Sequence, residues 1–228
     1  MIQLPDLPDL SLLADLCSEA AEAEHVQPFT IEKDFYLTRL IWALAQARGE
    51  RLLLYGGTLL SKVDLGYRRM SEDVDLLIPK NATSYRSTNV AETNQIRDTL
   101  RCPAQIVGLQ LANHIGEVFE KGAHGIWTLS YESTFGPQTI NVEASMRLPL
   151  RPPRRAALSQ LLSDPQVGDY SEAYCWALDA DEARAEKVRG HSRARPSGTI
   201  TTSINSCKRA RTSRRRTSSS SLTRSLPS

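Results

Sequence analysis

The spacing of apolar residues along the first fifty positions predicts two helices. From residue 12 to residue 23 the chain is rich in Leu, Ala and Glu, which favour a helix. After Pro28, Thr30 carries a side chain suited to a helix N-cap, and apolar residues then keep helical spacing to about Arg48. Residues 1–50 are therefore expected to form an N-terminal helical segment.

The next apolar runs are shorter and predict strands. Residues 52–55 form a run that stops at Gly56-Gly57, as a buried strand does when it ends in a tight turn. A short helix can begin behind this turn, at residues 58–63. Residues 73–78 then predict a second strand, because acidic and apolar positions alternate at its start.

Farther along, the pattern predicts two more helices, a hairpin and a final helix. Residues 89–100 and 109–120 have weak helical spacing. Residues 126–131 and 139–143 alternate as paired strands do, with a Gly-Pro turn between them. Residues 179–189 again favour a helix.

This mixture of helices and short strands predicts an α/β fold, in which a small mixed β-sheet is flanked by helices. Residues 51–150 would form the core that holds the sheet, and residues 151–190 a helical C-terminal segment that looks incomplete. Residues 191–228 contain eleven serines, almost no large apolar residue and no periodicity. We therefore expect this last segment to be a disordered tail.

The charge is divided unevenly between the body and the tail. Residues 191–228 hold nine of the 28 basic residues and no acidic one. The other 19 basic residues stand against all 26 acidic residues in the first 190 positions, so the body carries a formal charge of −7 and the tail +9. Because an acidic body is unusual for an RNA-binding protein, contact with RNA would need the tail or a local basic patch. Candidates for that patch are Lys62, Arg68, Arg69 and Arg147.

Targeting signals and cysteine usage bear on the compartment. The N-terminal residues lack the basic region of a signal peptide, and no apolar run is long enough to cross a membrane. The four cysteines lie far apart and include no C-x-x-C pair, which argues against a zinc site or a disulfide framework. We therefore expect a soluble protein of the reducing cytoplasm, without a membrane partner.

The first candidate chemical feature is the turn that follows residues 52–55. Gly56 and Gly57 let the backbone approach a ligand closely, and the helix start behind them presents unpaired N–H groups. Thr58 adds a hydroxyl group and Lys62 a positive charge about one turn later, so the set suits a triphosphate. Taken alone, however, such a pattern is more often an ordinary strand-to-helix turn.

The second feature is the carboxylate pair Asp73 and Asp75. In a strand, residues i and i+2 share a face, so both carboxylates point the same way. Two adjacent carboxylates repel each other unless a cation lies between them, and Mg²⁺ favours carboxylate and phosphate oxygens. The pair alone could also belong to a solvated acidic edge strand.

The third feature is Glu143, which shares one strand face with Asn141 and Ser145. A strand that pairs beside the strand of Asp73 would bring Glu143 to the same metal ions; otherwise it belongs to an exposed polar face. Together the three features are far more specific than any one of them. They predict a two-metal site in which one ion activates an acceptor hydroxyl and the other neutralises pyrophosphate.

At this point the residues resemble a known family. Residues 56–62 (Gly-Gly-Thr-Leu-Leu-Ser-Lys) and 69–76 (Arg-Met-Ser-Glu-Asp-Val-Asp-Leu) resemble the signature of the AbiEii/AbiGii-type nucleotidyltransferase toxins. These toxins belong to the minimal branch of the DNA polymerase β-like superfamily. Residues 31–36 resemble the family's helix before the first strand, and residues 181–188 resemble its E-x-x-x-x-K helix. The resemblance covers about residues 28–189.

The resemblance implies the toxin half of a bacterial toxin–antitoxin system. Such toxins transfer nucleotides from NTPs, in some cases onto the 3′ end of tRNA, which stops translation. Asp73 and Asp75 would bind Mg²⁺ or Mn²⁺, and Lys187 would contact the nucleotide phosphates. Glu143 matches the third acidic position of the superfamily approximately. The nucleotide-binding set would be Gly56, Gly57, Thr58, Lys62, Arg69 and Ser71.

The resemblance also implies a partner protein, the cognate antitoxin, beside the RNA acceptor. In some relatives the antitoxin acts by phosphorylating a hydroxyl group at the active site of the toxin. Thr58 and Ser71 are the candidates for that modification here.

The chain departs from the family pattern after Gly190. Similar proteins continue with more helices and an Arg-Asp-x-Tyr-Asp-like segment that supplies another acidic residue, and nothing of that kind follows here. Either the basic tail is a real arm that helps to bind RNA, or a frameshift has replaced the C-terminal helical part. The break inside a helix favours the frameshift. Two other functions stay open: a catalytically degenerate binding module, or a nucleotidyltransferase that acts on a protein or small molecule.

Overall fold

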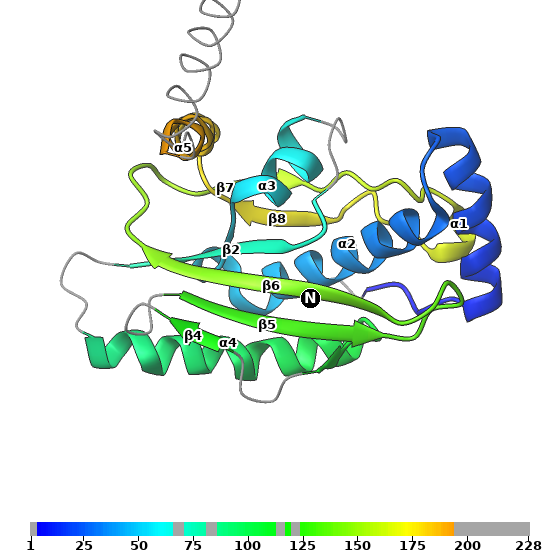
Figure 1. The fold of residues 1–228 in the computed structure, drawn as a ribbon, viewed down its shortest axis with the longest axis horizontal. Coiled ribbons are helices and arrows are strands. Elements are labelled where there is room, and N and C mark those ends of the chain that lie inside the picture. The colour runs from blue at the N-terminus through cyan, green and yellow to red at the C-terminus, as the bar shows by residue number, and fades with distance from the viewer. Residues whose placement is uncertain (1–3, 66–70, 81–85, 113–116, 120–123, 194–228) are drawn as a thin grey trace, which may run out of the picture. The chain divides into compact units, whose positions relative to one another are not determined.

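The structure is a computed structural model, whose fold is drawn in Figure 1. The chain divides into two compact units after Glu186. The residues that it describes are 4–65, 71–80, 86–112, 117–119 and 124–193. The predicted disorder of the tail is wrong for residues 191–193, which end a helix, and residues 194–228 lie outside the described ones. The first unit contains the whole β-sheet and both N-terminal helices.

The helices agree in their main lines with the sequence predictions. They are α1 (Leu10–Glu24), α2 (Pro28–Arg48), α3 (Gly56–Leu59), α4 (Arg86–Ile106) and α5 (Ala180–Arg193). The predicted N-cap at Thr30 is wrong, because α2 begins earlier, with Gln27 as its N-cap residue. Pro28 is favoured in the first turn of a helix, where its missing N–H costs nothing.

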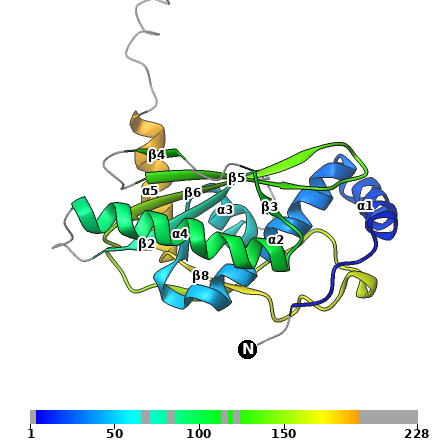
Figure 2. The ribbon, with the colours of Figure 1, turned by 90° about the horizontal axis from the view of Figure 1, so that it is seen from below.

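Helix α2 is the centre of the hydrophobic core. Its side chains are buried almost continuously from Ile31 to Ala45, which explains why the segment has little amphipathic character. It packs against α1, α4, β6 and β8. Figure 2 shows α2 and α4 on the same side of β5 and β6. Because α2 is enclosed, its polar residues Glu32, Asp34, Thr38 and Arg39 are buried too.

The described strands form one mixed sheet in the order β3-β5-β6-β2-β1-β8-β7, and β4 also pairs with β5. They are β1 (Leu53–Leu54), β2 (Val74–Pro79), β3 (Gln110–Leu111), β4 (Glu117–Phe119), β5 (His124–Tyr131), β6 (Gln138–Arg147), β7 (Arg154–Ala157) and β8 (Tyr174–Ala177). The central pair, β2 and β6, is parallel, whereas β5 and β6 form the predicted antiparallel hairpin. These observations confirm an α/β fold with a mixed sheet flanked by helices.

Two sequence predictions about elements are wrong. Residues 109–120 are not a helix, since β3 and β4 lie there and both pair with β5. Helix α4 is closed just before them, where Leu109 N–H donates to the carbonyl oxygen of Ala104 at 2.7 Å and Gly108 has φ +82°. Residues 151–190 are not all helical either, because β7 and β8 extend the sheet before α5 begins.

The hydrophobic core is continuous across the predicted N-terminal, central and C-terminal segments. Buried side chains of α1 and α2, of β1, β2 and β6, and of the region around β8 form one cluster. The segments 1–50 and 51–150 therefore belong to the same compact unit. None of the helices in the described part of the chain combines the length and apolar character that a membrane span needs.

Candidate active site

The turn after β1 is built around a glycine that no other residue can replace without strain. Gly56 has φ +65°, a left-handed conformation that disfavours residues with a Cβ atom. A Cβ atom at this position would lie 2.3 Å from Oδ2 of Asp75. Tyr55 N–H donates to the carbonyl oxygen of Asp75 at 3.1 Å, which brings the turn against β2. Gly56 is thus required both by its backbone angle and by the carboxylate beside it.

The carboxylate of Asp75 is held by the backbone of this turn. Its Oδ2 accepts hydrogen bonds from Gly57 N–H at 2.8 Å and Thr58 N–H at 3.4 Å. Burial raises the pKa of Asp75, the two N–H groups lower it, and the charge of Asp73 raises it again. Burial is the largest of these causes, so the pKa of Asp75 is raised, and its carboxylate lies near that of Asp73.

The side-chain hydroxyl of Thr58 joins the glycine turn to the start of β2. Its side chain is 0% exposed, and its hydroxyl group lies 2.5 Å from the carbonyl oxygen of Asp73, 3.2 Å from Ser71 Oγ and 3.3 Å from the backbone nitrogen of Asp75. These contacts fix the start of β2 and the carboxylate pair. They do not support the predicted contact between the Thr58 side chain and a nucleotide, since the hydroxyl is enclosed. Ser71 is only half-buried, so of the two hydroxyl groups it is the more accessible.

The register of the sheet brings Glu143 to the carboxylate pair. Strand β6 lies parallel to β2, and Glu143 stands directly beside Asp75. Of the two possibilities that the sequence left open for Glu143, the structure shows the one in which its strand pairs with the strand of Asp75. Val74 and Val142, on the opposite face, are fully buried. Burial raises the pKa of Glu143, Asp75 and Asp73 raise it further, and His124 lowers it.

The chemistry of these three acidic residues suits a divalent cation, but their side chains do not converge on one position. They supply carboxylate oxygens, which Mg²⁺ and Mn²⁺ favour, and their mutual repulsion would be relieved by a cation. Within the described residues, however, no three His, Cys, Asp or Glu side chains converge as a ligand group. Asp75 is turned toward Gly57, so its carboxylate would have to rotate to take part. Asp73 and Asp75, the predicted metal ligands, are the residues that would hold the ion.

Lys62 differs from the prediction, because it lies in the protein interior. A single π-helical turn, Leu60–Asp64, follows α3 and places its side chain, 2% exposed, against α2. Its Nζ lies 2.6 Å from Oδ1 of Asp34 and donates to Thr38 Oγ1 at 2.6 Å. A lysine enclosed in this way anchors the glycine turn to α2. Its burial argues against the predicted contact with nucleotide phosphates.

Comparison with known families agrees with this site. Residues 39–200 match the family described as nucleotidyl transferase AbiEii toxin, type IV toxin–antitoxin system. The match includes the glycine turn, both strands of the carboxylates and α5.

The chain belongs to the AbiEii family.

Solved structures offer partial likenesses. JHP933 from Helicobacter pylori is 16% identical over 53% of this chain and 45% of that chain, with a TM-score of 0.36. An H. pylori protein proposed to be a nucleotidyltransferase is 17% identical over 53% of this chain and 46% of that chain, also with a TM-score of 0.36. Each match spans less than half of the H. pylori chain. No curated protein matches the sequence.

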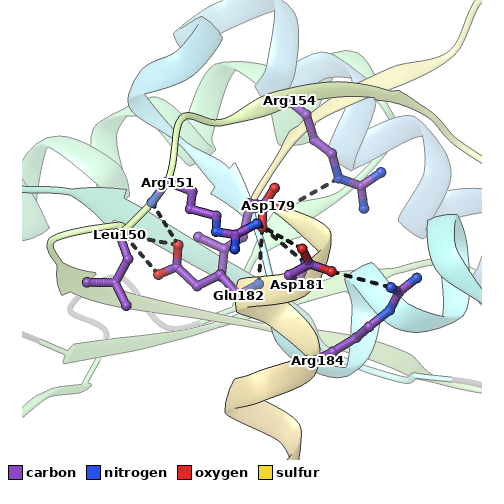
Figure 3. A network of polar contacts seen from close by, with 8 residues as sticks. Leu150, Arg151, Arg154, Asp179, Asp181, Glu182 and Arg184 are labelled. Carbon is purple, nitrogen blue, oxygen red and sulfur yellow. Dashed lines mark hydrogen bonds and ion pairs between the residues drawn. The ribbon is translucent and has the colours of Figure 1, made fainter.

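The E-x-x-x-x-K helix that resembles AbiEii toxins begins in a polar network (Figure 3). Asp179 caps α5 by accepting from Asp181 N–H at 3.1 Å and Glu182 N–H at 3.2 Å. The carboxylate of Glu182 accepts from Leu150 N–H at 2.9 Å and Arg151 N–H at 3.1 Å. The motif glutamate is thus a structural anchor that joins α5 to the loop after β6.

Two other predicted residues cannot be placed against the carboxylates. Lys187 is the first residue of the second unit, and its predicted role at the nucleotide stays a prediction. Arg69 lies outside the described residues. Arg147, from the proposed basic patch, pairs through its guanidinium group with Glu186 and lies 5.0 Å from the centroid of the Tyr55 ring. Its charge is therefore largely balanced within the protein.

Sequence reasoning missed a row of polar side chains beside Glu143. Tyr55 donates to Ser145 Oγ at 3.1 Å, and Ser145 Oγ lies 3.0 Å from Nδ1 of His124. His124 and Ser145 are opposite each other in the β5–β6 pairing. The place of His124 in this row follows from the strand register, which no spacing in the sequence shows. Trp127, on the same strand as His124, is 1% exposed and belongs to the hydrophobic core.

Proposed function

We propose that this AbiEii-family chain is a metal-dependent nucleotidyltransferase that transfers NMP from an NTP to an RNA acceptor. The acceptor that fits the proposal best is the 3′ end of tRNA, where the transfer would block translation. The chain would act as the toxin of a type IV toxin–antitoxin system and be restrained by a cognate antitoxin. A cytoplasmic location follows from this role as a further prediction.

The observation that carries the proposal is the alignment of Asp75 with Glu143 across parallel strands. It joins two residues that are 68 positions apart in the sequence on one face of the sheet. Asp73 precedes them on the same face, and the glycine turn contacts Asp75 directly. Like charges in one place destabilise a fold, so their presence supports a functional role.

The proposed transfer is a nucleophilic displacement at the α-phosphorus of the NTP. A hydroxyl oxygen of the acceptor forms a bond to the α-phosphorus of the NTP, and the bond from that phosphorus to the bridging oxygen of the β-phosphate breaks. Pyrophosphate leaves. We assign Glu143 to take the proton of the acceptor hydroxyl. Glu143 lies beside Asp75, and its carboxylate accepts no hydrogen bond from the described residues. A bound Mg²⁺ or Mn²⁺ would neutralise charge on the phosphates.

The glycine turn would bind the triphosphate through its backbone. Gly56 and Gly57 have no side chains to block the approach of a ligand, and the N–H group of Gly57 already binds an anionic oxygen, that of Asp75. A nucleotide phosphate could replace the carboxylate there when Asp75 rotates toward a metal ion. Ser71, which is half-buried at the edge of this turn, would face the same ligand.

A label-transfer assay tests the proposal. The purified protein is mixed with Mg²⁺, total tRNA and each α-labelled NTP in turn, beside Asp73→Ala/Asp75→Ala. We expect label on tRNA with the wild type and a loss of at least about 100-fold in the variant, the scale of a lost electrostatic group in a catalytic site. Glu72→Ala is the matched control, since Glu72 is an exposed neighbouring acid outside the pair.

The outcomes separate the alternatives. Equal labelling by the wild type and the double variant would exclude these carboxylates as the active site. Metal-dependent NTP binding without transfer would favour a degenerate binding module. Transfer to a protein or small molecule, but not to RNA, would keep the enzyme and overturn the acceptor.

A further inference from the structure

A second row of side chains crosses the sheet on the side of Asp73. Thr128 on β5 lies opposite Asn141 on β6, and its Oγ1 donates to Asn141 Oδ1 at 3.1 Å. Asn141 Nδ2 in turn donates to Asp73 Oδ1 at 3.3 Å. The row therefore leads from β5 through an amide to one of the proposed metal ligands.

The carboxylate of Asp73 decides which way the amide of Asn141 points. An asparagine side chain has one accepting and one donating end, whereas a carboxylate only accepts. With the opposite amide orientation, Oδ1 of Asn141 would face the carboxylate of Asp73, and Nδ2 would face the hydroxyl. The NH₂ group therefore faces Asp73, and the hydroxyl of Thr128 holds the other end of the amide by donating to Oδ1.

The donors that hold the carboxylate pair are electrically neutral. Asp73 receives the amide of Asn141, and Asp75 receives the backbone N–H groups of Gly57 and Thr58. A lysine or arginine at position 141 would fix Asp73 equally well but would cancel its charge. A neutral donor fixes the direction of the carboxylate and leaves its charge for a cation, as groups behind metal ligands commonly do.

We propose that Asn141, held in place by Thr128, is a positioning residue that aims the carboxylate of Asp73 at the metal ion of nucleotidyl transfer. The proposal rests on the proposed function for its catalytic part only. Nothing in the pattern of the sequence singled out Thr128, which gains its place from the antiparallel register of β5 and β6. Asn141 acts through Asp73 and need not touch the substrate.

The test compares Asn141→Leu, Thr128→Val and the double variant. Each is assayed for transfer and, separately, for the dissociation constant of Mn²⁺. For Asn141→Leu we expect kcat to fall and the Kd of Mn²⁺ to rise by about 10- to 100-fold, with the KM for NTP little changed. Thr128→Val should give a smaller change in the same direction. Because Thr128 acts through Asn141, the double variant should be no worse than Asn141→Leu alone.

Thr139→Val is the matched control. Thr139 is an exposed residue of β6 on the same face, two positions before Asn141. It should leave both kcat and Mn²⁺ binding unchanged. Asn141→Asp adds a negative charge and removes the donor, so it should slow transfer at least as much as Asn141→Leu.

Several results would overturn the positioning role. The effects of Thr128→Val and Asn141→Leu would multiply if the residues acted independently. A loss of thermal stability with unchanged Mn²⁺ affinity would make Asn141 a structural residue only. Failure of the wild type to bind Mn²⁺ would remove the proposal altogether. If the wild type left both RNA and NTP unchanged while the variants showed the expected rise in the Kd of Mn²⁺, the proposed reaction would be wrong. The positioning role of Asn141 would then still hold.

Discussion

Two charged clusters in this protein differ in a way that separates structure from function. In the core, Asp34 of α2 and Lys62 pair at 2.6 Å, and both are almost completely buried. On the face of the sheet, Asp73, Asp75 and Glu143 carry the same charge. Opposite charges balance the first cluster, whereas the second has no comparable balance within the described residues.

The buried pair is explained by the fold alone. Asp34 Oδ2 also accepts from Leu161 N–H at 3.0 Å, so one carboxylate joins α2, the segment after the glycine turn and the segment after β7. Burial lowers the pKa of Lys62, and Asp34 opposes this change. The three acidic residues have no such oppositely charged partner among themselves. Under the proposed function, a bound cation would offset their repulsion.

The largest stability effect is expected from breaking the buried pair. Lys62→Met leaves Asp34 charged and without its cation in the core, which should lower the free energy of unfolding by about 3–5 kcal/mol. Urea denaturation measures the change. The surface pair Lys33–Glu72, at 3.1 Å, is the matched comparison, and Lys33→Met should cost less than about 1 kcal/mol.

A second variant keeps this prediction testable if Lys62→Met does not fold. Asp34→Asn/Lys62→Met removes the orphan charge and should recover part of the lost stability. Equal effects of Lys62→Met and Lys33→Met would show that the buried pair is not the anchor that its geometry indicates. If Lys62→Met had normal stability but a higher KM for NTP, the result would favour a contact between Lys62 and the nucleotide, against what its burial indicates.

The glycine turn lies between the two clusters and gives a smaller effect on stability. Gly56→Ala forces a Cβ atom into the left-handed region and into contact with Asp75, so it should cost about 1–3 kcal/mol and disturb the carboxylate. Gly49→Ala is the control, because Gly49 has φ +57° with no atom within 4 Å of an added Cβ. Both should lower the melting temperature, but only Gly56→Ala should abolish transfer. Loss of transfer in both variants would mean that backbone strain alone inactivates the site.

The smallest effect concerns the pH dependence of the acidic cluster. Because the pKa of Glu143 is raised in the folded state, the folded protein binds its proton more tightly than the unfolded chain. The charged form therefore lowers stability at neutral pH, and this loss disappears as the pH falls toward the ordinary glutamate value of 4.5. Glu143→Gln should be more stable than the wild type at pH 7, by less than about 1 kcal/mol, and equal to it near pH 4.

Denaturation of the wild type and Glu143→Gln across this pH range measures the difference. Glu172→Gln serves as the control, since Glu172 is an exposed residue in the turn before β8. A variant that is less stable than the wild type at pH 7 would show that Glu143 makes a stabilising contact instead.

The sequence predicted the parts of the site that depend on local periodicity. Asp73 and Asp75 share a face because strand residues alternate, and the glycine turn ends a strand because Gly56 tolerates a positive φ. Alternation alone left the pairing of β6 beside β2 open, and the structure shows that the two strands pair.

What the sequence could not give depends on long-range contacts. The interior position of Lys62 follows from its contacts with Asp34 and Thr38 of α2, which no spacing in the sequence reveals. Strand β8 was not predicted, because its four residues form a strand through pairing with β1 and β7. Asn141 was noted for its face, but its bond to Asp73 depends on the register of three strands.

One measurement tests the central claim, that the acidic cluster is kept for a cation and not for stability. Mn²⁺ binding and urea denaturation are measured for the wild type and for Asp73→Asn/Asp75→Asn. The account predicts that the wild type binds Mn²⁺ and gains about 2.7 kcal/mol at 100 times its Kd, while the variant binds none and, without metal, is at least as stable. A variant that still binds Mn²⁺ equally well, or that unfolds at lower urea without metal, would contradict the account.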